Sequence, residues 1–406
     1  MKEYKKLKEP LQTLVKQIVN ITQRYNAEAF LVGGPLRDLL MTKGKSKNIL
    51  TDLDIAVTNS YYEIGKDLAK TLKTEVIHYP QFMTMTLQCP HLRIDVAQTR
   101  KEYYSRPAVL PQVSPASIEE DLKRRDFTIN AMALKLTKKP PYPIIDLFNG
   151  QKDLKSGIIR ILHTSSFSDD PTRIFRAIRF AVRLGFEIEP MTKLLMKKAI
   201  FNNQINLLSG ERILHELKMI LKEKEATRML KTLQKYGIIK NVFGVQLPKK
   251  FFQESQLLDK FQDSEAKLSH LFAYLPESTW SRFPLTNKIK DCATAIKKFS
   301  QLRKSLMRAK SASRIYQILS SLPKSTLETL SIIEKKPIRE KIKLYLEKYS
   351  KVKFHISGKL LQSLQIPSGP IYRKILENLR YQILDGKVKN KEQEIEYVRS
   401  LIKCQI

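Results

Sequence analysis

Two glycines, a proline and an arginine near the N-terminus form a pattern that is suited to binding phosphate. Gly33 and Gly34 follow a short apolar run, and Pro35 then suits the first turn of a helix. Such a turn leaves backbone N–H groups free to face an anion at the start of the helix. Arg37, followed by Asp38, adds a fixed cation beside it. The pattern therefore predicts an anion site at a helix N-terminus.

Two carboxylates follow on a second apolar run, TDLDIAV. Strand side chains alternate, so Asp52 and Asp54 would point to one face and repel each other unless a cation lay between them. Mg²⁺ is the obvious candidate. The alternative is a solvated pair of acids in a loop, which the apolar neighbours disfavour. Asp95, in the strand-like run LRIDVAQ, could add a third carboxylate or be a simple edge-strand aspartate.

Together these two features are what nucleotidyl transfer requires. One metal ion would lower the pKa of an attacking hydroxyl, and a second would hold the triphosphate and the leaving oxygens. Positioning and charge neutralisation would then do most of the catalysis, as in phosphoryl transfer generally.

Paired arginines occur in a second motif, DLKRRDFTINAMAL, which begins at Asp121. Arg124 and Arg125 precede Asp126, and an apolar, strand-like run follows. Beside a metal site, two guanidinium groups would suit contacts to phosphate or sugar. Taken by itself, the motif would also fit a surface ion-pair cluster at a turn.

A stripe of arginines marks a helix that we expect over residues 171–184. At roughly 100° per residue the arginines fall within an arc of about 120°, and apolar residues take much of the opposite side. Because the stripe contains no lysine, it favours forked hydrogen bonds to phosphates or base edges over a merely solvated face. Asp170, before Pro171, suits the helix N-cap, and its carboxylate could accept from an exocyclic amine. The stripe consists of Arg173, Arg176, Arg179 and Arg183.

The remaining periodicity predicts a mixed N-terminal part followed by helices. In the mixed part we expect helices at 11–25 and 61–73 and strands at 29–32, 53–57, 75–78, 84–88 and 92–97. Residues 100–118 contain three prolines and no clear period, which indicates a loop. Later helices are expected at 190–200, 209–223, 225–236 and 255–274. Arg212 and Glu216 are four residues apart on one of these helices and are expected to pair.

The chain has 406 residues, 42% of them hydrophobic, and a formal charge of +33. An excess of this size is common in proteins that bind nucleic acid or anionic membranes, although a general lysine bias is the plain alternative. The chain contains no apolar run of about 18 residues, so no membrane span is predicted. The N-terminus lacks the apolar core of a secretory signal. Cys89, Cys292 and Cys404 fit no metal-site pattern, which favours a reduced, cytoplasmic setting.

Taken in order, the motifs resemble those of the class II tRNA nucleotidyltransferase and bacterial poly(A) polymerase family, within the polymerase-β superfamily. The resemblance implies an α+β fold, in which a small mixed-sheet head like that of polymerase β precedes an all-α neck, body and tail. The head would occupy residues 1–137 and the base-recognising neck 138–245, and residues 246–406 would form the tRNA-binding body and tail. The matching pieces are LVGGPLRDLL with TDLDIAV, EEDLKRRDFTINAMAL, IIDLFNGQKDLKSGIIRIL, DDPTRIFRAIRFAVRLGF and GERILHELKMIL.

The resemblance also implies ligands and roles. The substrates would be the tRNA acceptor arm and CTP or ATP, the cofactor two Mg²⁺ ions, and the by-product pyrophosphate. Asp52 and Asp54 would hold the metal ions, and Asp95 remains the candidate third catalytic carboxylate. The family's base-selecting EDxxR motif would lie at Asp169, Asp170 and Arg173. The full nucleotide-binding set is Gly33, Gly34, Arg37, Asp38, Arg125, Asp169, Asp170, Arg173, Arg176 and Arg179.

The chain departs from the family pattern at two places. Asp169 stands where the motif has Glu, and a shorter acid changes the reach toward the arginine or the base. The connection between Arg37 and Asp52 is several residues longer than usual and predicts an enlarged loop.

Which nucleotides are added stays open: CCA, only CC, or only A. The loop TRKEYYSRPAVLPQVSPAS lacks the DGRR-type sequence of many full CCA-adding enzymes and looks more like members that add only A or only CC. The absence of a GRRF-like segment disfavours one alternative, a poly(A) polymerase. The intact glycine and aspartate motifs disfavour the other, a non-catalytic basic RNA-binding protein.

Overall fold

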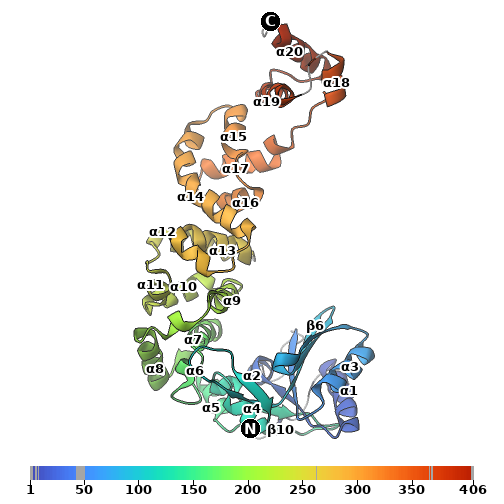
Figure 1. Ribbon diagram of the computed structural model, residues 1–406, viewed down its shortest axis with the longest axis vertical. Helices are drawn as coiled ribbons and strands as arrows, with labels where there is room; N and C mark the ends of the chain where they lie inside the picture. The colour runs from blue at the N-terminus through green and yellow to red at the C-terminus, as the bar shows by residue number, and fades with distance from the viewer. Residues whose placement is uncertain are drawn as a thin grey trace. The chain divides into compact units, whose positions relative to one another are not determined.

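A computed structural model describes residues 3–4, 7, 9–42, 51–261, 263–364, 366 and 369–403 (Figure 1). The chain divides into two compact units. Unit 1 comprises residues 1–217 and 228–242, and unit 2 comprises residues 218–227 and 243–406. Most of the enlarged loop expected before Asp52, residues 43–50, lies outside the described residues, as does Cys404.

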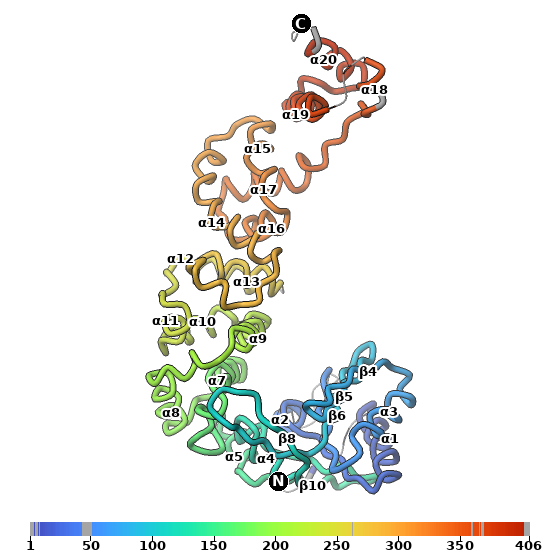
Figure 2. The backbone as a smooth tube through the Cα atoms, in the orientation of Figure 1, coloured from blue at the N-terminus to red at the C-terminus, as the bar shows by residue number. Residues whose placement is uncertain are grey.

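An eight-stranded mixed sheet forms the centre of unit 1. Its strand order is β1-β10-β9-β2-β3-β6-β5-β4, and Figure 2 shows β4, β5 and β6 next to one another at one edge. β3 and β6 run parallel, whereas the other neighbouring strands run antiparallel. The strands are β1 (Glu3–Tyr4), β2 (Ala29–Val32), β3 (Asp52–Val57), β4 (Glu75–Tyr79), β5 (Thr84–Cys89), β6 (Leu92–Gln98), β9 (Ala133–Lys135) and β10 (Tyr142–Ile145).

The expected strands and the α+β class are confirmed, and the sheet extends further along the chain than the sequence suggested. β10 pairs with both β9 and β1, so the sheet of the head continues to Ile145, beyond the expected boundary at 137. Residues 136–141, which include Pro140 and Pro141, connect β9 to β10, so the chain does not become helical at residue 138.

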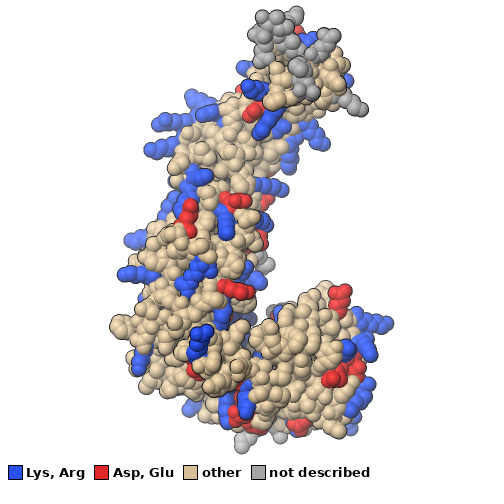
Figure 3. All heavy atoms as spheres, in the orientation of Figure 1, with Lys and Arg blue, Asp and Glu red and all other residues tan. Residues whose placement is uncertain are grey.

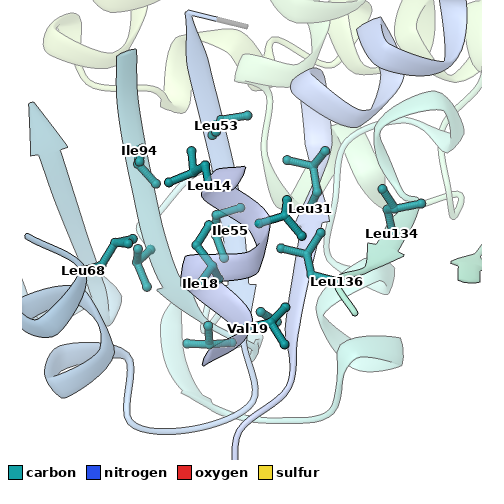
Figure 4. Close-up of a cluster of buried hydrophobic side chains, with 14 of the residues drawn as sticks. Leu14, Ile18, Val19, Leu31, Leu53, Ile55, Leu68, Ile94, Leu134 and Leu136 are labelled. Carbon is teal, nitrogen blue, oxygen red and sulfur yellow. The ribbon is translucent and has the colours of Figure 1, made fainter. Parts of the chain in front are cut away.

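Two helices, α1 (Leu11–Arg24) and α3 (Tyr61–Leu72), cover one face of the sheet. Leu14 and Ile18, four residues apart on α1, belong to a buried cluster with strand residues from across the sheet (Figure 4). Leu53 and Ile55 of β3 belong to the same cluster. Since strand side chains alternate, β3 directs its carboxylates to the opposite face of the sheet.

A short helix, α4 (Ile118–Lys123), packs on that opposite face. Its Ile118 and Leu122 form a second buried cluster with sheet residues that include Phe30 and Ala56. The paired arginines of the second motif follow α4 directly, so the packing of this helix places them beside the sheet.

Residues 100–118 contain a β-hairpin, so the expectation of a loop was wrong there. β7 (Arg100–Tyr103) pairs antiparallel with β8 (Gln112–Pro115). Two of the three prolines lie in the connection between the strands and the third ends β8, so they leave the pairing intact. At the hairpin tip, the Ala108 N–H donates to the carbonyl of Asp169 (3.3 Å).

Helices follow from residue 150 onward, earlier than the start expected at residue 171. The helices expected at 171–184, 190–200, 209–223 and 225–236 are confirmed within a few residues as α7 (Thr172–Leu184), α8 (Pro190–Phe201), α9 (Gly210–Leu221) and α10 (Ala226–Lys235). The other helices of unit 1 are α2 (Gly33–Met41), which lies within the sheet region, α5 (Gly150–Ser156), α6 (Ser166–Asp169) and α11 (Ile238–Phe243). Strands β11 (Ile158–Ile159) and β12 (Glu187–Ile188) form a small parallel pair among them.

The described part of unit 2 is helical. The single helix expected at 255–274 is instead two, because the Asp263 carboxylate accepts from the N–H groups of Glu265 and Ala266 and starts a new helix. Among the described residues, no helix is both long and apolar enough to span a membrane. The helices are α12 (Lys249–Leu258), α13 (Ser264–Ala273), α14 (Asn287–Arg308), α15 (Ala312–Leu319), α16 (Lys324–Ile333), α17 (Ile338–Glu347), α18 (Gly358–Ser363), α19 (Pro370–Leu384) and α20 (Lys391–Lys403).

Gly150 lies where α5 packs on the turn that carries the second motif, and a larger residue at this position would test that packing. A Cβ at Gly150 would lie 2.2 Å from the Thr128 carbonyl oxygen, a backbone atom that cannot move aside cheaply. We expect Gly150→Ala to lower the free energy of unfolding by about 1–3 kcal/mol, measured by denaturant unfolding. Gly358→Ala is the control, because a Cβ at that helix start meets nothing within 4 Å. Equal stability of the two variants would contradict this account of the packing.

Candidate functional site

A cleft of about 1580 Å³ lies in unit 1 and gathers most of the predicted site residues. It is lined from α2, β3, the turn after α4, and α7. Two predicted residues, Asp95 and Asp169, are not part of its lining. The predicted residues that do line it are Gly33, Gly34, Arg37, Asp38, Asp52, Asp54, Arg125, Asp170, Arg173, Arg176 and Arg179.

The N-terminus of α2 opens into this cleft. The helix begins at Gly33, directly after β2, and no side chain caps it. Gly33 has a φ of +69°, and a Cβ there would lie 3.0 Å from Asp54 Oδ2 and 3.2 Å from Arg125 Nη1. Glycine is therefore required both by the backbone and by the two side chains that close in on it. The helix start that the sequence predicted is confirmed, and it sits against a carboxylate and a guanidinium.

Asp52 and Asp54 lie on the same side of β3, as the alternation predicted. In the parallel register Asp52 is opposite Arg93 and Asp54 is opposite Asp95. Burial raises the pKa of Asp54 to about 6; Arg125 opposes the rise, and the charges of Asp95 and Asp52 add to it. The protein therefore surrounds this carboxylate with less positive charge than it needs, which is the electrostatic condition for binding a cation.

Asp95 is held beside this pair by other partners. Its carboxylate accepts from the Thr86 hydroxyl (2.6 Å) and pairs with Arg93 (3.0 Å). Within the ranges that the structure describes, no three His, Cys, Asp or Glu side chains are grouped so that they could hold a metal ion. The charge of Asp95 also contributes to the raised pKa of Asp54.

The paired arginines share one buried carboxylate, so they are not a surface cluster at a turn. Asp121 accepts from Nη2 of Arg124 and from Nη2 of Arg125, each at 2.8 Å. Burial would raise the pKa of Asp121, but the two guanidinium groups hold it below its usual range. Arg124 also donates to Glu102 (2.8 Å) at the end of the hairpin strand β7. Arg125 is thereby fixed with one nitrogen at the start of α2.

Asp126 links the sheet region to α7. One of its oxygens accepts from the Asn130 amide (3.0 Å), whose own oxygen accepts from Nη1 of Arg37 (2.9 Å). The other oxygen accepts from Nη2 of Arg176 (2.6 Å). Burial alone would raise the pKa of Asp126, but Arg176 and the Asn130 hydrogen bond bring it to about 2. Two arginines from different elements are therefore held through one permanently ionised carboxylate.

Asp170 lies just before α7 and faces the cleft. The N-cap position falls on Pro171, one residue later than expected, and Asp170 Oδ1 accepts from the N–H of Thr172 (3.0 Å), the first residue of the helix. The expected pair of Arg212 with Glu216 is wrong, because Arg212 instead donates to Asp170 Oδ1 (2.7 Å) and to the Ala108 carbonyl at the hairpin tip (2.8 Å). Helix spacing permits the pair that we expected, but a carboxylate and a carbonyl from elsewhere in the fold offer Arg212 two acceptors.

The other two members of the base-selecting motif are differently placed. Arg173 is buried and donates to the Ser166 hydroxyl (2.7 Å) and the Arg124 carbonyl (2.8 Å), so it reaches the cleft as a rigid group. Asp169, outside the cleft lining, accepts from the Ser165 hydroxyl (3.1 Å). The motif thus presents one acid and one arginine to the cleft.

Three residues organise the site in ways that the sequence did not predict. Asn130 bridges Arg37 and Asp126, and Arg212 holds Asp170. Phe180 lines the cleft between several arginines. A signal existed only for Phe180, which follows Arg176 by four residues and so lies on the arginine side of the helix.

Two family models match parts of the chain. Residues 29–160 match the family model described as the poly A polymerase head domain. Residues 185–248 match the model described as a probable RNA and SrmB-binding site of polymerase A.

Solved structures decide the family. A CCA-adding enzyme in apo form II is 30% identical, with a TM-score of 0.80 over 97% of this chain and 96% of that chain. The chain belongs to the class II tRNA nucleotidyltransferase family. Two further members were solved with ligands. The CCA-adding enzyme of Thermotoga maritima complexed with tRNA-CCA is 29% identical (TM-score 0.75, 98% and 96% covered), as is a CCA-adding enzyme in complex with ATP (TM-score 0.79, 98% and 96% covered).

Three similar members of the tRNA nucleotidyltransferase family are named A-adding enzymes. The one from Aquifex aeolicus is 34% identical over 80% of this chain, and the one from Geobacter sulfurreducens 30% over 96%. The chain spans only 41% and 47% of the length of these two proteins. The one from Halalkalibacterium halodurans is 27% identical, and the similarity covers 91% of that protein and 95% of this chain.

The raised pKa of Asp54 predicts how the stability of the metal-free protein depends on pH. The folded state binds the Asp54 proton more tightly than the unfolded chain does, since its pKa is about 6 against an ordinary 3.8. This group's contribution to stability is therefore present at low pH and is lost as the pH rises through about 6.

We expect Asp54→Asn to unfold at a higher temperature than the wild-type protein at pH 8 in a chelator, because it removes a buried, poorly compensated charge. The difference should shrink as the pH falls through about 6. Thermal melts across the pH range measure it, with Asp52→Asn at the exposed position of the pair as control. A wild-type protein more stable than Asp54→Asn at pH 8 would show that Asp54 is well compensated without metal.

Proposed function

We propose that this protein transfers a nucleotide from a nucleoside triphosphate to the 3′ end of tRNA, with release of pyrophosphate, and that the nucleotide it adds is A. The observation that supports the transfer most directly is the convergence at Gly33 of a helix N-terminus, Asp54 and Arg125. A triphosphate there would meet backbone N–H groups and a guanidinium, next to carboxylates that favour a cation. The A-adding relatives support the choice of nucleotide.

Asp52 and Asp54 fit the two Mg²⁺ ions that this chemistry uses. They lie on one strand face, one exposed and one partly buried, and the pKa of Asp54 is raised first by burial and then by the neighbouring charges of Asp95 and Asp52. When bound, the ions would lower the pKa of the RNA 3′-hydroxyl and neutralise the phosphates. The protein's part is positioning. Arg37 and Arg125 are held by Asn130 and Asp121 before any substrate arrives.

The base would be read by Asp170 and Arg173. In the described part of the chain, the hydrogen bonds to the Asp170 carboxylate all end on Oδ1, which leaves Oδ2 for a ligand. Adenine and cytosine both present an exocyclic amine beside a ring-nitrogen acceptor, so one acid and one arginine suit both of these bases and neither guanine nor uracil. Choosing A over C would then depend on how far apart the cleft holds these groups.

Unit 2 would bind the tRNA. On the face shown in Figure 3, Lys and Arg side chains are spread over this unit with few acidic side chains among them. Together with the net charge of +33, this distribution suits recognition of the RNA backbone and shape. We infer a cytoplasmic setting, in keeping with the free thiols of Cys89 and Cys292.

A poly(A) polymerase is the second candidate, because the family model that matches residues 29–160 is that of a poly A polymerase head. Both enzymes would use the same head chemistry. They differ in whether synthesis stops, so the length of the product separates them.

The deciding experiment offers CTP and ATP, singly and together, to tRNAs that end before CCA, after C and after CC. We expect a single A on the tRNA that ends in CC, seen as a one-nucleotide shift on a sequencing gel. Asp52→Ala should abolish addition while tRNA binding in a filter assay stays largely intact. Addition of CC would contradict the proposed addition of A, and a long tail would favour a poly(A) polymerase. Full activity of Asp52→Ala would refute the proposed metal site.

Arg173→Ala tests base reading. The change removes a buried guanidinium that Ser166 and Arg124 hold at the cleft. We expect discrimination between ATP, CTP and UTP, measured as ratios of kcat/KM, to fall by about tenfold or more, since a fixed hydrogen-bond donor is lost. Binding of tripolyphosphate, which needs only the Arg37 side of the cleft, should change less. Unchanged discrimination would refute the role in base reading.

A further inference from the structure

The ring of Phe180 collects three guanidinium groups in the cleft. The Cζ atoms of Arg179, Arg37 and Arg176 lie 4.9, 5.1 and 5.5 Å from the ring centroid. Only 6% of Phe180 is exposed, and the ring packs edge-to-face on Phe127, with the two centroids 5.9 Å apart. An aromatic face attracts a cation, and the attraction is strongest where water is excluded.

These guanidinium groups belong to different parts of the proposed site. Arg37 comes from α2, beside the triphosphate end, whereas Arg176 and Arg179 come from α7, beside the base end. Like charges so close together repel each other, and each needs an anion. Asp38 and Asp126 pair with Arg37 and Arg176. Burial raises the pKa of Glu216, and the charges of the two α7 arginines oppose that rise.

Asn130 and Asp126 already connect Arg37 to Arg176, and the Phe180 ring adds a second connection, which also reaches Arg179 and so joins both ends of the cleft. Phe180 touches the arginines of both ends, and Phe127, the residue after Asp126, braces its ring. A nucleotide must reach both ends at once, so its affinity depends on the distance between them. Tripolyphosphate would occupy only the triphosphate end, so its affinity would not depend on this distance.

We propose that Phe180 is a positioning residue that sets the spacing between the triphosphate-side Arg37 and the base-side Arg176 and Arg179. The inference rests on the proposed function and adds to it a residue that acts through the arginines it contacts. Phe180 keeps the guanidinium groups at the separation that matches one nucleotide, and it contributes to affinity through that separation.

The test uses the full-length protein and isothermal titration calorimetry in Mg²⁺, with ATP and inorganic tripolyphosphate as ligands. Phe180→Leu keeps an apolar side chain and removes the aromatic face. We expect it to weaken ATP binding about tenfold and tripolyphosphate binding much less, because only ATP spans both ends. Phe180→Tyr keeps the ring and should restore the ATP affinity. In turnover assays, Phe180→Leu should raise KM for ATP more than it lowers kcat.

Phe175→Leu is the matched control, since it removes an equally buried ring from the apolar side of the same helix. It should lower the unfolding temperature without changing the ratio of the two affinities. The inference is overturned if Phe180→Leu leaves ATP binding unchanged, weakens both ligands equally, or is matched by Phe175→Leu. A wild-type protein that binds no ATP overturns the proposed function and this inference with it, whereas normal wild-type binding with an unaffected Phe180→Leu overturns the inference alone.

Discussion

The buried carboxylate of Asp126 is the constraint on which the arrangement of the site depends. It accepts from Arg176 on α7 and, through Asn130, orders Arg37 on α2. An ionised group in this position would be unstable without partners, and its pKa of about 2 reflects how fully those partners compensate its burial. Arg176 pairs with this carboxylate directly, whereas Arg37 reaches it through Asn130 and also pairs with Asp38. The sheet region and the helix that carries the arginine stripe are therefore joined by charge as well as by apolar packing.

The sheet determines on which face the carboxylates of the site lie. Strand β3 turns Leu53 and Ile55 into the core beneath α1 and α3, and the same alternation puts Asp52 and Asp54 in the cleft. Slipping the register by one residue would bury the carboxylates and expose the leucine and isoleucine, so the apolar core fixes which face holds the acids. The position of the proposed metal site is thus a by-product of hydrophobic burial.

Local patterns in the sequence were sufficient for the parts of the site that lie close together along the chain. The glycine turn at Gly33, the alternation of Asp52 with Asp54, and the helix start after Asp170 each depend on a few neighbouring residues. The hairpin at residues 100–118 was missed because pairing between strands leaves little periodicity when both faces are partly exposed. The partner of Arg212 was missed because it lies far away in sequence, and helix spacing offered a plausible local partner instead. Long-range choices among several acceptors are settled by the fold and leave no local pattern.

The carboxylate of Asp121 also affects how this chain can vary over generations. It neutralises Arg124 and Arg125 and accepts from the Arg100 N–H at the start of the hairpin (3.2 Å). A mutation at this one codon would therefore disturb the hairpin and the guanidinium beside the glycine turn at the same time. No change at either arginine alone could compensate for it. The hairpin and the arginine pair are therefore expected to be retained or lost together, whereas substitutions at exposed residues nearby are expected to have little effect.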